Sequence, residues 1–354
     1  MALAEIGTRI ARSLPPERAH NATIKALKTG IGVPLSAKTD DPALQVTLPI
    51  SGLRLPNPVG LAPGFDKNAE VFAPMFRFGF GMVECGTVTP RPQVGNPKPR
   101  LFRLTEDRAV INRMGFNNQG LNAFVRRLQR GGAQKGALGA NVGANKTSED
   151  RIADYVTGLT AVWPHADYVT INISSPNTPG LRGLQDGGAL EDLLGQCAEA
   201  AAKLTLKRPV FLKVAPDLDD TAIADIIKTV RGARPFLTGL IISNTTIERP
   251  DTLKSADQGE AGGLSGAPLM DMSTRVLRSF ASEVSGEFDL IGVGGIASGD
   301  DAYAKIKAGA HAVQLYSALV YEGPALAERI KGDLVNLLQR DGFKSVTESV
   351  GSGL

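Results

Sequence analysis

Amide and hydroxyl side chains gather in residues 172–182, directly after a β-type run at residues 168–171. Asn172, Ser175 and Asn177 place two amides around one hydroxyl, and two prolines and a glycine break the run abruptly. Ligands of parallel α/β proteins bind at the carboxyl ends of strands, so this pattern predicts a binding site. The segment contains no acidic residue, histidine or cysteine, so any base within it has to be a serine.

A glycine-rich turn at residues 292–296 follows an apolar run and leads into a helix start at residues 297–300. Glycines let the backbone approach an anion closely, and N–H groups at a helix start hold phosphate. Residues 313–317 close the last predicted strand, and residues 262–266 offer further N–H groups. Because loops after the seventh and eighth strands are the usual phosphate site of a (β/α)8 barrel, we predict a phosphate site here. The alternative is a plain tight turn.

Lys67 and Lys213 each follow or end an apolar strand-like run. A lysine in such surroundings is costly to bury without a partner, and a single one is often a structural ion pair. Two of them opposite a phosphate loop suit a ligand that gains negative charge. A flavin that becomes anionic on reduction fits, and so does a lysine that forms a Schiff base with a sugar phosphate.

Further amides lie near predicted strand ends at residues 112–118 and 243–246. An asparagine offers both a donor and an acceptor, so such a cluster suits a planar substrate with several hydrogen-bonding groups. Any single asparagine has the alternative role of stabilising a turn. Polar groups recur at the ends of most predicted strands, which favours one shared active-site mouth.

Short β-rich runs alternate with amphipathic helical patterns from about residue 58 onwards. This alternation predicts an α/β fold, a (β/α)8 TIM barrel with an N-terminal helical extension, and a doubly wound sheet is the alternative. The predicted strands are 59–62, 82–85, 137–142, 168–173, 210–214, 239–243, 290–293 and 312–316. The predicted helices are 68–78, 119–130, 149–162, 189–206, 219–230, 270–283, 300–308 and 323–339. Residues 86–117 are too long for a simple connection and contain their own β-type piece at 101–104.

Residues 1–40 precede the predicted barrel and have a helical pattern, with Leu3, Ile6, Ile10 and Leu14 on one apolar stripe. Basic residues outnumber acidic ones in this segment, so the helices suit an anionic membrane surface. The alternative is a helical cap that packs on the barrel. We therefore divide the chain into this segment, a barrel at 41–340 and a C-terminal tail at 341–354.

The composition excludes several classes of function. A net charge of +3 and the lack of a dense basic run argue against nucleic-acid binding. Two cysteines and three histidines at unrelated spacings argue against a disulfide framework and a metal site. There is no run long and apolar enough to span a membrane, and no convincing signal peptide.

Taken together, the motifs resemble dihydroorotate dehydrogenase, and they look like its class 2, quinone-dependent branch. The resemblance covers about residues 14–340. It rests on the motifs at 65–68, 86–93, 112–118, 172–182, 213–217 and 292–296, and on 14–20 in the N-terminal extension.

The resemblance implies an FMN-bearing barrel that oxidises dihydroorotate to orotate in pyrimidine biosynthesis. By position it implies that Ser175 is the base that takes the C5 proton, while hydride leaves C6 for the flavin. Class 1 relatives carry a cysteine there, so Ser175 indicates class 2. A free serine is a poor base, so a hydrogen-bonded relay has to assist it. The resemblance puts Thr178 and Phe116 where a water is ordered for it.

The resemblance also implies two sets of binding residues. The substrate contacts are Lys67, Asn112, Arg113, Met114, Gly115, Phe116, Asn172, Asn177, Asn244 and Thr245. The FMN contacts are Ala62, Pro63, Gly64, Phe65, Asp66, Lys67, Thr87, Asn141, Asn172, Lys213, Ser243, Gly266, Gly295, Tyr316 and Ser317. Ser243 stands where many members have threonine, a change that keeps the hydroxyl.

For reoxidation the family uses a membrane quinone that enters between the N-terminal helices, which favours the membrane interpretation of residues 1–40. His20, Arg103 and Tyr316 match positions near the quinone tunnel. The resemblance thus implies a peripheral protein on the cytoplasmic face of a bacterial-type cell membrane, bound to an anionic surface through these helices. We expect a monomer, with no nucleic-acid partner and no metal.

Three rival interpretations remain. A class 1 enzyme that uses fumarate or NAD would need a cysteine at position 175 and no N-terminal extension, and this sequence meets neither requirement. A phosphate-binding aldolase or isomerase would use Lys67 or Lys213 as a Schiff base and would be colourless. A peripheral membrane protein with an inactive barrel would not need the polar groups retained at the strand ends.

Overall fold

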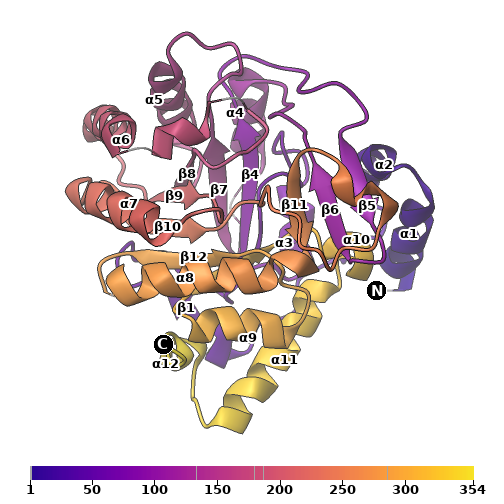
Figure 1. Ribbon diagram of the computed structural model, residues 1–354. Helices are drawn as coiled ribbons and strands as arrows, with labels where there is room; N and C mark the ends of the chain where they lie inside the picture. The colour runs from indigo at the N-terminus through magenta and orange to yellow at the C-terminus, as the bar shows by residue number, and fades with distance from the viewer. Residues whose placement is uncertain (1, 133, 179, 186, 285) are drawn as a thin grey trace.

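Eight parallel strands close into a barrel in the order β10-β12-β13-β3-β4-β7-β8-β9 (Figure 1). The computed structural model describes residues 2–132, 134–178, 180–185, 187–284 and 286–354, with the backbone alone for residues 2–6 and 9. The predicted TIM barrel is confirmed, and the doubly wound alternative is wrong because β10 and β9 complete a closed ring.

All eight predicted barrel strands are present, with ends that differ by a few residues. They are β3 (Val59–Leu61), β4 (Met82–Val88), β7 (Ala137–Val142), β8 (Tyr168–Asn172), β9 (Val210–Val214), β10 (Gly239–Ile242), β12 (Asp289–Val293) and β13 (Ala312–Leu315). Every residue of these strands is buried, as expected of parallel strands covered by helices.

Helices surround the barrel in the predicted order. They are α3 (Phe72–Arg77), α4 (Leu121–Arg130), α5 (Arg151–Val162), α6 (Gly187–Ala202), α7 (Asp220–Gly232), α8 (Met270–Val284), α9 (Gly299–Lys307), α10 (Leu319–Glu322) and α11 (Leu326–Asp341). The helix predicted from residue 68 begins later, because Asp66 accepts the backbone N–H groups of Glu70 and Val71 and holds that stretch as a loop. The helix predicted at 323–339 is preceded by α10, from which Gly323 at φ +72° separates it.

The amino ends of the barrel strands are closed. A short hairpin of β1 (Val46–Thr47) and β2 (Arg54–Leu55) lies there. The carboxylate of Asp289, at the start of β12, accepts the N–H groups of Ile50 (3.0 Å) and Ser51 (2.9 Å) in that hairpin. The carboxyl ends of the strands are therefore the accessible end.

A second sheet lies beside the carboxyl ends of the barrel. It consists of β5 (Leu101–Leu104), β6 (Ala109–Asn112) and β11 (Gly263–Gly266), paired antiparallel in the order β11-β6-β5. The predicted piece at 101–104 is thus confirmed as β5. This sheet brings segments 151 positions apart to one side of the barrel mouth, because Asn112 is paired with Gly263.

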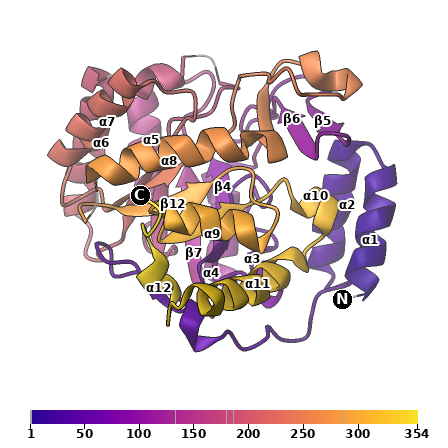
Figure 2. The same cartoon turned by 60° about the horizontal axis from the view of Figure 1, so that its bottom comes forward.

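The N-terminal helices α1 (Ala2–Ser13) and α2 (Pro16–Lys28) pack side by side against β5 and α10 (Figures 1 and 2). Ala19 and Leu27 of α2 are buried, whereas Ile10 and Leu14 are 61% and 37% exposed. The side chains of Leu3 and Ile6, which belong to the predicted stripe, lie outside the described residues. Among the helices that the structure describes, none is long and apolar enough to cross a membrane.

The last residues of the chain pack against the barrel helices. They include α12 (Val346–Ser349), whose Val346 is fully buried, and Gly351 and Gly353 donate backbone hydrogen bonds to Ile306 (3.1 Å) and Lys307 (2.9 Å) of α9. The C-terminal segment thus covers one face of α9.

Candidate active site

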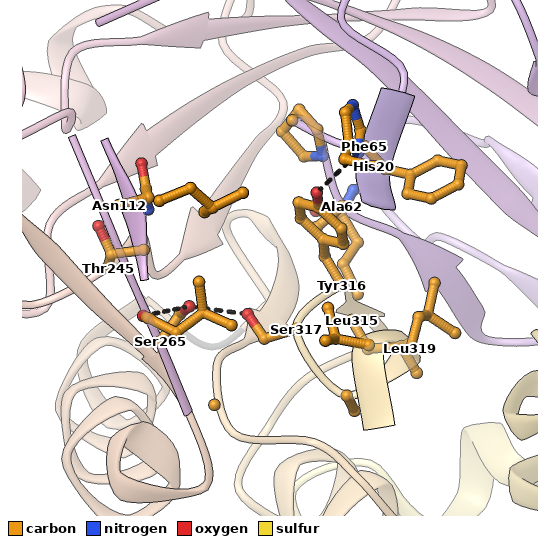
Figure 3. A pocket seen from close by; sticks show the side chains of 18 of the residues that line it. His20, Ala62, Phe65, Asn112, Thr245, Ser265, Leu315, Tyr316, Ser317 and Leu319 are labelled. Carbon is orange, nitrogen blue, oxygen red and sulfur yellow. Dashed lines mark hydrogen bonds between the residues drawn. The ribbon is translucent and has the colours of Figure 1, made fainter. Parts of the chain in front are cut away.

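One cavity of about 320 Å³ opens at the carboxyl end of the barrel. It extends from α1 and α2, past the ends of the barrel strands, to the loops after β6, β8 and β10. Figure 3 shows His20, Phe65 and Tyr316 gathered in one part of it, apart from Asn112 and Thr245. The predicted site residues that line it are His20, Ala62, Pro63, Gly64, Phe65, Lys67, Thr87, Arg103, Asn112, Met114, Gly115, Phe116, Asn172, Ser175, Asn177, Lys213, Ser243, Asn244, Thr245, Gly266, Gly295, Tyr316 and Ser317.

Three predicted site residues, Asp66, Arg113 and Asn141, do not line the cavity. The buried carboxylate of Asp66 holds the loop before α3. The guanidinium of Arg113 forms an ion pair with Glu260 at 2.6 Å and lies 4.5 Å from the ring centroid of Phe102. Only the backbone of Arg113 is therefore available near the substrate loops.

Asn141 belongs to a buried hydrogen-bond network beneath the cavity. Its side-chain oxygen accepts from Thr87 Oγ1 at 2.5 Å and from Asn172 Nδ2 at 3.2 Å. Asn172 also donates to Thr87 Oγ1 at 2.9 Å. Because Thr87 and Asn172 both line the cavity, Asn141 fixes the orientation of two cavity residues without reaching the cavity itself.

Glu84 anchors this network and was not predicted from the sequence. Its carboxylate, fully buried in β4, accepts hydrogen bonds from Asn141 (2.7 Å), Gln314 (2.7 Å) and Tyr168 (3.1 Å). Burial and the neighbouring Glu84 raise the pKa of Tyr168 far above its ordinary value. The sequence did contain a sign of its role, because an acidic residue is unusual inside an apolar strand. A charged residue inside an apolar strand was also the reason for selecting Lys213 in β9.

The two predicted lysines differ in their partners. Lys67 donates to the carbonyl oxygen of Gly64 at 2.7 Å, and burial together with the nearby Arg100 lowers its pKa to about 8. Lys213 is 4% exposed and lines the cavity, and its ammonium has no hydrogen-bond partner in the described part of the chain. Burial lowers the pKa of Lys213, while the charge of Glu84 opposes that effect. Lys213 thus offers a buried amino group to the cavity, and an anionic ligand there would favour its protonated form.

Ser175 lies in the cavity wall without a titratable hydrogen-bond partner among the described residues. Its hydroxyl oxygen accepts the N–H of Asn177 at 3.3 Å, and the residue is buried. The hydroxyl of Thr178, also buried, has no partner in the described structure. Phe116, which lines the same cavity, has a φ of +53°. The unpartnered Thr178 hydroxyl is able to hold a water near this loop.

The predicted substrate amides converge from three different elements. Asn177, after β8, donates to Asn112 Oδ1 at the end of β6 at 3.3 Å. Asn244, after β10, donates to Ser174 Oγ at 2.9 Å and accepts the N–H of Thr245 at 2.8 Å. The buried hydroxyl of Thr245 has no hydrogen-bond partner among the residues that the structure describes. Donors and acceptors therefore surround one part of the cavity, as a planar polar ligand requires.

Glycines form the wall where the phosphate site was predicted. Gly266, Gly294 and Gly295 line the cavity with φ values of +99°, +111° and +83°. A Cβ on Gly295 would lie 2.6 Å from the backbone nitrogen of Met270, the first residue of α8, so only glycine fits. Beside them, Ser317 donates to Ser265 Oγ at 2.7 Å (Figure 3). This wall presents backbone groups that an anion can approach closely.

The cavity ends in an aromatic region under the N-terminal helices. The ring of Phe65 meets the rings of His20 and Tyr316 edge-on, at centroid distances of 5.8 and 5.7 Å. Arg103 of β5 donates to the carbonyl oxygen of Arg12 in α1 at 2.7 Å. The three predicted tunnel residues thus line the end of the cavity where the two helices meet the barrel and β5.

The comparisons with known proteins agree with this architecture. A family model described as dihydroorotate dehydrogenase matches residues 44–338. Relatives named dihydroorotate dehydrogenase (quinone) occur in Xanthobacter autotrophicus, at 52% identity, and in Novosphingobium aromaticivorans, at 54%, each alignment covering 96% of both chains. A crystal structure of DHODH from Eimeria tenella in complex with ferulenol is 39% identical with a TM-score of 0.91, covering 96% of this chain and 95% of that one. The match runs nearly end to end in sequence and in fold, and the chain belongs to the dihydroorotate dehydrogenase family.

Proposed function

We propose that this protein is a peripheral membrane flavoenzyme that oxidises dihydroorotate to orotate for pyrimidine biosynthesis, with FMN as cofactor and a membrane quinone as electron acceptor. The family and its quinone-named relatives support the reaction. The observation that carries the proposal is a continuous cavity, which joins the amide cluster around Ser175 to the aromatic region at His20. One chain supplies every group that the proposal needs, so we propose a monomer.

The residues of the cavity fit FMN. The glycine wall at Gly294 and Gly295 suits the phosphate, and the unpartnered oxygen of Gln314 and the free ammonium of Lys213 suit the polar edge of the ring system. When bound, FMN supplies the two-electron acceptor that the oxidation requires. Lys213 offsets negative charge that develops on the cofactor, because its ammonium is buried and has no hydrogen-bond partner among the described residues.

The substrate side of the cavity supports proton removal by Ser175. Asn112, Asn177 and Asn244 offer the donors and acceptors that orient a dihydropyrimidine through its ring amide groups. The Ser175 oxygen then takes the C5 proton while its hydroxyl passes its own proton to a neighbouring water. A serine needs help to act as a base, and a water held by the unpartnered Thr178 hydroxyl is the relay we propose.

The N-terminal helices support the membrane part of the proposal. Ile10, Leu14, Ile31 and Leu35 are exposed although they are large and apolar, and Leu35 is 99% exposed. Arg12, Arg18, Lys25 and Lys28 are exposed on the same segment. Apolar and basic side chains together favour an anionic surface, which is typical of the cytoplasmic leaflet. The helices also bury Ala19 and Leu27, so they act as a cap on the barrel as well.

Anaerobic addition of dihydroorotate to the purified protein tests the function. We expect a yellow protein whose flavin absorbance bleaches on addition of dihydroorotate and returns on addition of a hydrophobic quinone. A colourless protein that does not take up FMN would contradict the proposal and favour the aldolase alternative. A bleached flavin that is reoxidised by fumarate or NAD but not by quinone would contradict only the choice of acceptor.

A further inference from the structure

Three polar residues between β4 and β5 support the substrate loops from outside the cavity, two through their side chains and the third, an arginine, through its carbonyl oxygen, which accepts the N–H of Arg113 at 2.9 Å. They are Gln93, Asn96 and Arg100, here called the loop brace. Asn96 Nδ2 donates to the carbonyl oxygens of Arg113 (3.0 Å) and Asn177 (3.2 Å). One side chain therefore bridges the segment after β6 to the segment after β8, which carry the amide cluster.

The brace sits unusually close to the first of these segments. The N–H of Asn96 donates to the carbonyl oxygen of Met114 at 3.0 Å. Gly115 has a φ of +71°, and a Cβ there would lie 2.8 Å from the side chain of Asn96. Gln93 Nε2 donates to the carbonyl oxygens of both Gly115 and Phe116 at 3.1 Å. The backbone of this substrate loop is thus held at several successive positions.

Arg100 connects the brace to the N-terminal helices. Its Nη1 donates to the carbonyl oxygens of Val94 (2.6 Å) and Asn96 (2.9 Å). Its Nη2 and Nε donate to the carboxylate of Glu17 in α2 at 2.7 and 3.3 Å. Burial works against ionisation of Glu17, but Arg100 and Lys98 hold its pKa below the ordinary value. Such a bidentate pair is specific in geometry as well as charge.

We propose that Asn96 and Arg100 are positioning residues for dihydroorotate, and that Glu17 couples the N-terminal helices to the substrate loops through them. The inference rests on the proposed function and deepens it. Asn96 fixes the relative position of the loops that carry Asn112 and Asn177, so its loss weakens substrate binding without removing a substrate contact. Glu17 makes α2 part of this support, although α2 borders the opposite, aromatic end of the cavity.

Orotate binding to the oxidised holoenzyme, followed by the change in flavin absorbance, tests the role of Asn96. We expect Asn96→Ala to bind orotate about tenfold more weakly, because two hydrogen bonds that join the loops are lost. We expect FMN content and the limiting rate of flavin reduction at saturating dihydroorotate to stay within about twofold of wild type, because Asn96 does not touch the reacting groups. Wild-type affinity for orotate in Asn96→Ala would overturn the assignment.

A second variant keeps the test usable if Asn96→Ala misfolds. Asn96→Asp keeps the size of the side chain and removes both N–H donors, so it should show the same weakened binding if Asn96→Ala purifies without FMN. If Asn96→Asp retained FMN and bound orotate like wild type, the positioning role would be overturned.

The coupling to α2 is tested by a double-mutant cycle on orotate affinity. Glu17→Gln should weaken orotate binding about threefold, and the double variant with Asn96→Ala should bind about as weakly as Asn96→Ala alone, because both act along one path. Lys98→Met is the matched control: Lys98 contacts Glu17 at 3.4 Å but has no contact with Asn96 among the described interactions, so affinity should not change. Strictly additive losses would overturn the coupling.

These outcomes separate the inference from the proposed function. If dihydroorotate does not bleach the wild-type flavin and orotate does not bind, the proposed function fails. If wild type behaves as expected and none of the brace variants changes orotate affinity, only the inference fails.

Discussion

His20 Nδ1 lies 3.4 Å from the hydroxyl of Tyr316, so α2 meets the end of the last barrel strand at the cavity wall. Burial, with a smaller effect of Lys67, lowers the pKa of His20 to about 3. The imidazole is therefore neutral at physiological pH and is able to accept the Tyr316 hydroxyl. This end of the cavity combines aromatic surface with a neutral imidazole and a phenol, and Arg103 lines it as well. The aromatic surface suits a quinone ring, whereas the amide cluster suits a polar substrate.

Ser175→Ala should abolish most flavin reduction while FMN and orotate still bind. Removing a positioned base slows proton transfer by about 10²–10⁴-fold. The Ser175 hydroxyl only accepts one weak hydrogen bond, from Asn177 at 3.3 Å, so its removal disturbs the loop little. Single-turnover flavin bleaching by dihydroorotate measures the effect, with the exposed Ser282→Ala as control. Bleaching at the wild-type rate would exclude Ser175 as the base.

Gly295→Ala should abolish the binding of FMN. The new Cβ would be forced against the backbone of Met270, and the residue would keep a φ of +83° that alanine adopts with strain. Gly342→Ala is the matched control, since Gly342 has a φ of +80° with open space around it. We expect the control to lose about 1 kcal/mol of stability and keep FMN. The flavin-to-protein ratio after purification distinguishes the two.

Lys305→Met should stabilise the protein at neutral pH. Burial lowers the pKa of Lys305 from 10.5 to about 7, and among the described residues its ammonium hydrogen-bonds only the hydroxyls of Ser273 and Thr274. Between these two pH values the unfolded chain holds a proton that the folded chain lacks, so the wild type loses stability as pH falls from 10.5 to 7 and no further below. At ~1.4 kcal/mol per pKa unit, the upper bound is about 5 kcal/mol.

The free energy of unfolding, measured from pH 6 to 10, tests whether the wild type loses stability as the pH falls. The advantage of Lys305→Met should be largest at pH 6–7 and shrink towards pH 10. Lys331→Met should instead destabilise at neutral pH, because the buried Lys331 forms ion pairs with Asp40 (2.6 Å) and Glu328 (2.8 Å). A pH-independent difference for Lys305→Met would show that the lysine is not neutralised by burial.

The barrel was predictable because its strands are short β-rich runs, separated by helical periodicity, and this pattern is local in the chain. Helix starts were less accurate: Asp66 accepts the N–H groups four and five residues further on, so the loop before α3 extends beyond the predicted start at residue 68. Gly323 and Pro324 did carry a local signal for the break between α10 and α11.

The cavity lining followed from motifs at strand ends, since the carboxyl ends of parallel strands converge in space. The residues that support the substrate loops from outside the cavity did not follow from such motifs. The bridge from Asn96 to Asn177 spans 81 positions, and the pair of Glu17 with Arg100 spans 83, so neither has a spacing that a local pattern can reveal. Glu84 is the exception, because an acid within an apolar strand is visible in the sequence.

Ile10→Asp with Leu14→Asp should release the protein from anionic vesicles without affecting flavin reduction. Both side chains are exposed, so their replacement costs little folding energy, whereas two carboxylates on α1 and its end oppose insertion into an anionic surface. Co-sedimentation with vesicles of anionic lipid measures binding, and oxidation by a hydrophobic quinone should slow in parallel. Leu206→Asp changes another exposed leucine, 47% exposed and distant in sequence from the helices, and should keep wild-type binding. Equal vesicle binding by all three proteins would contradict docking through the N-terminal helices.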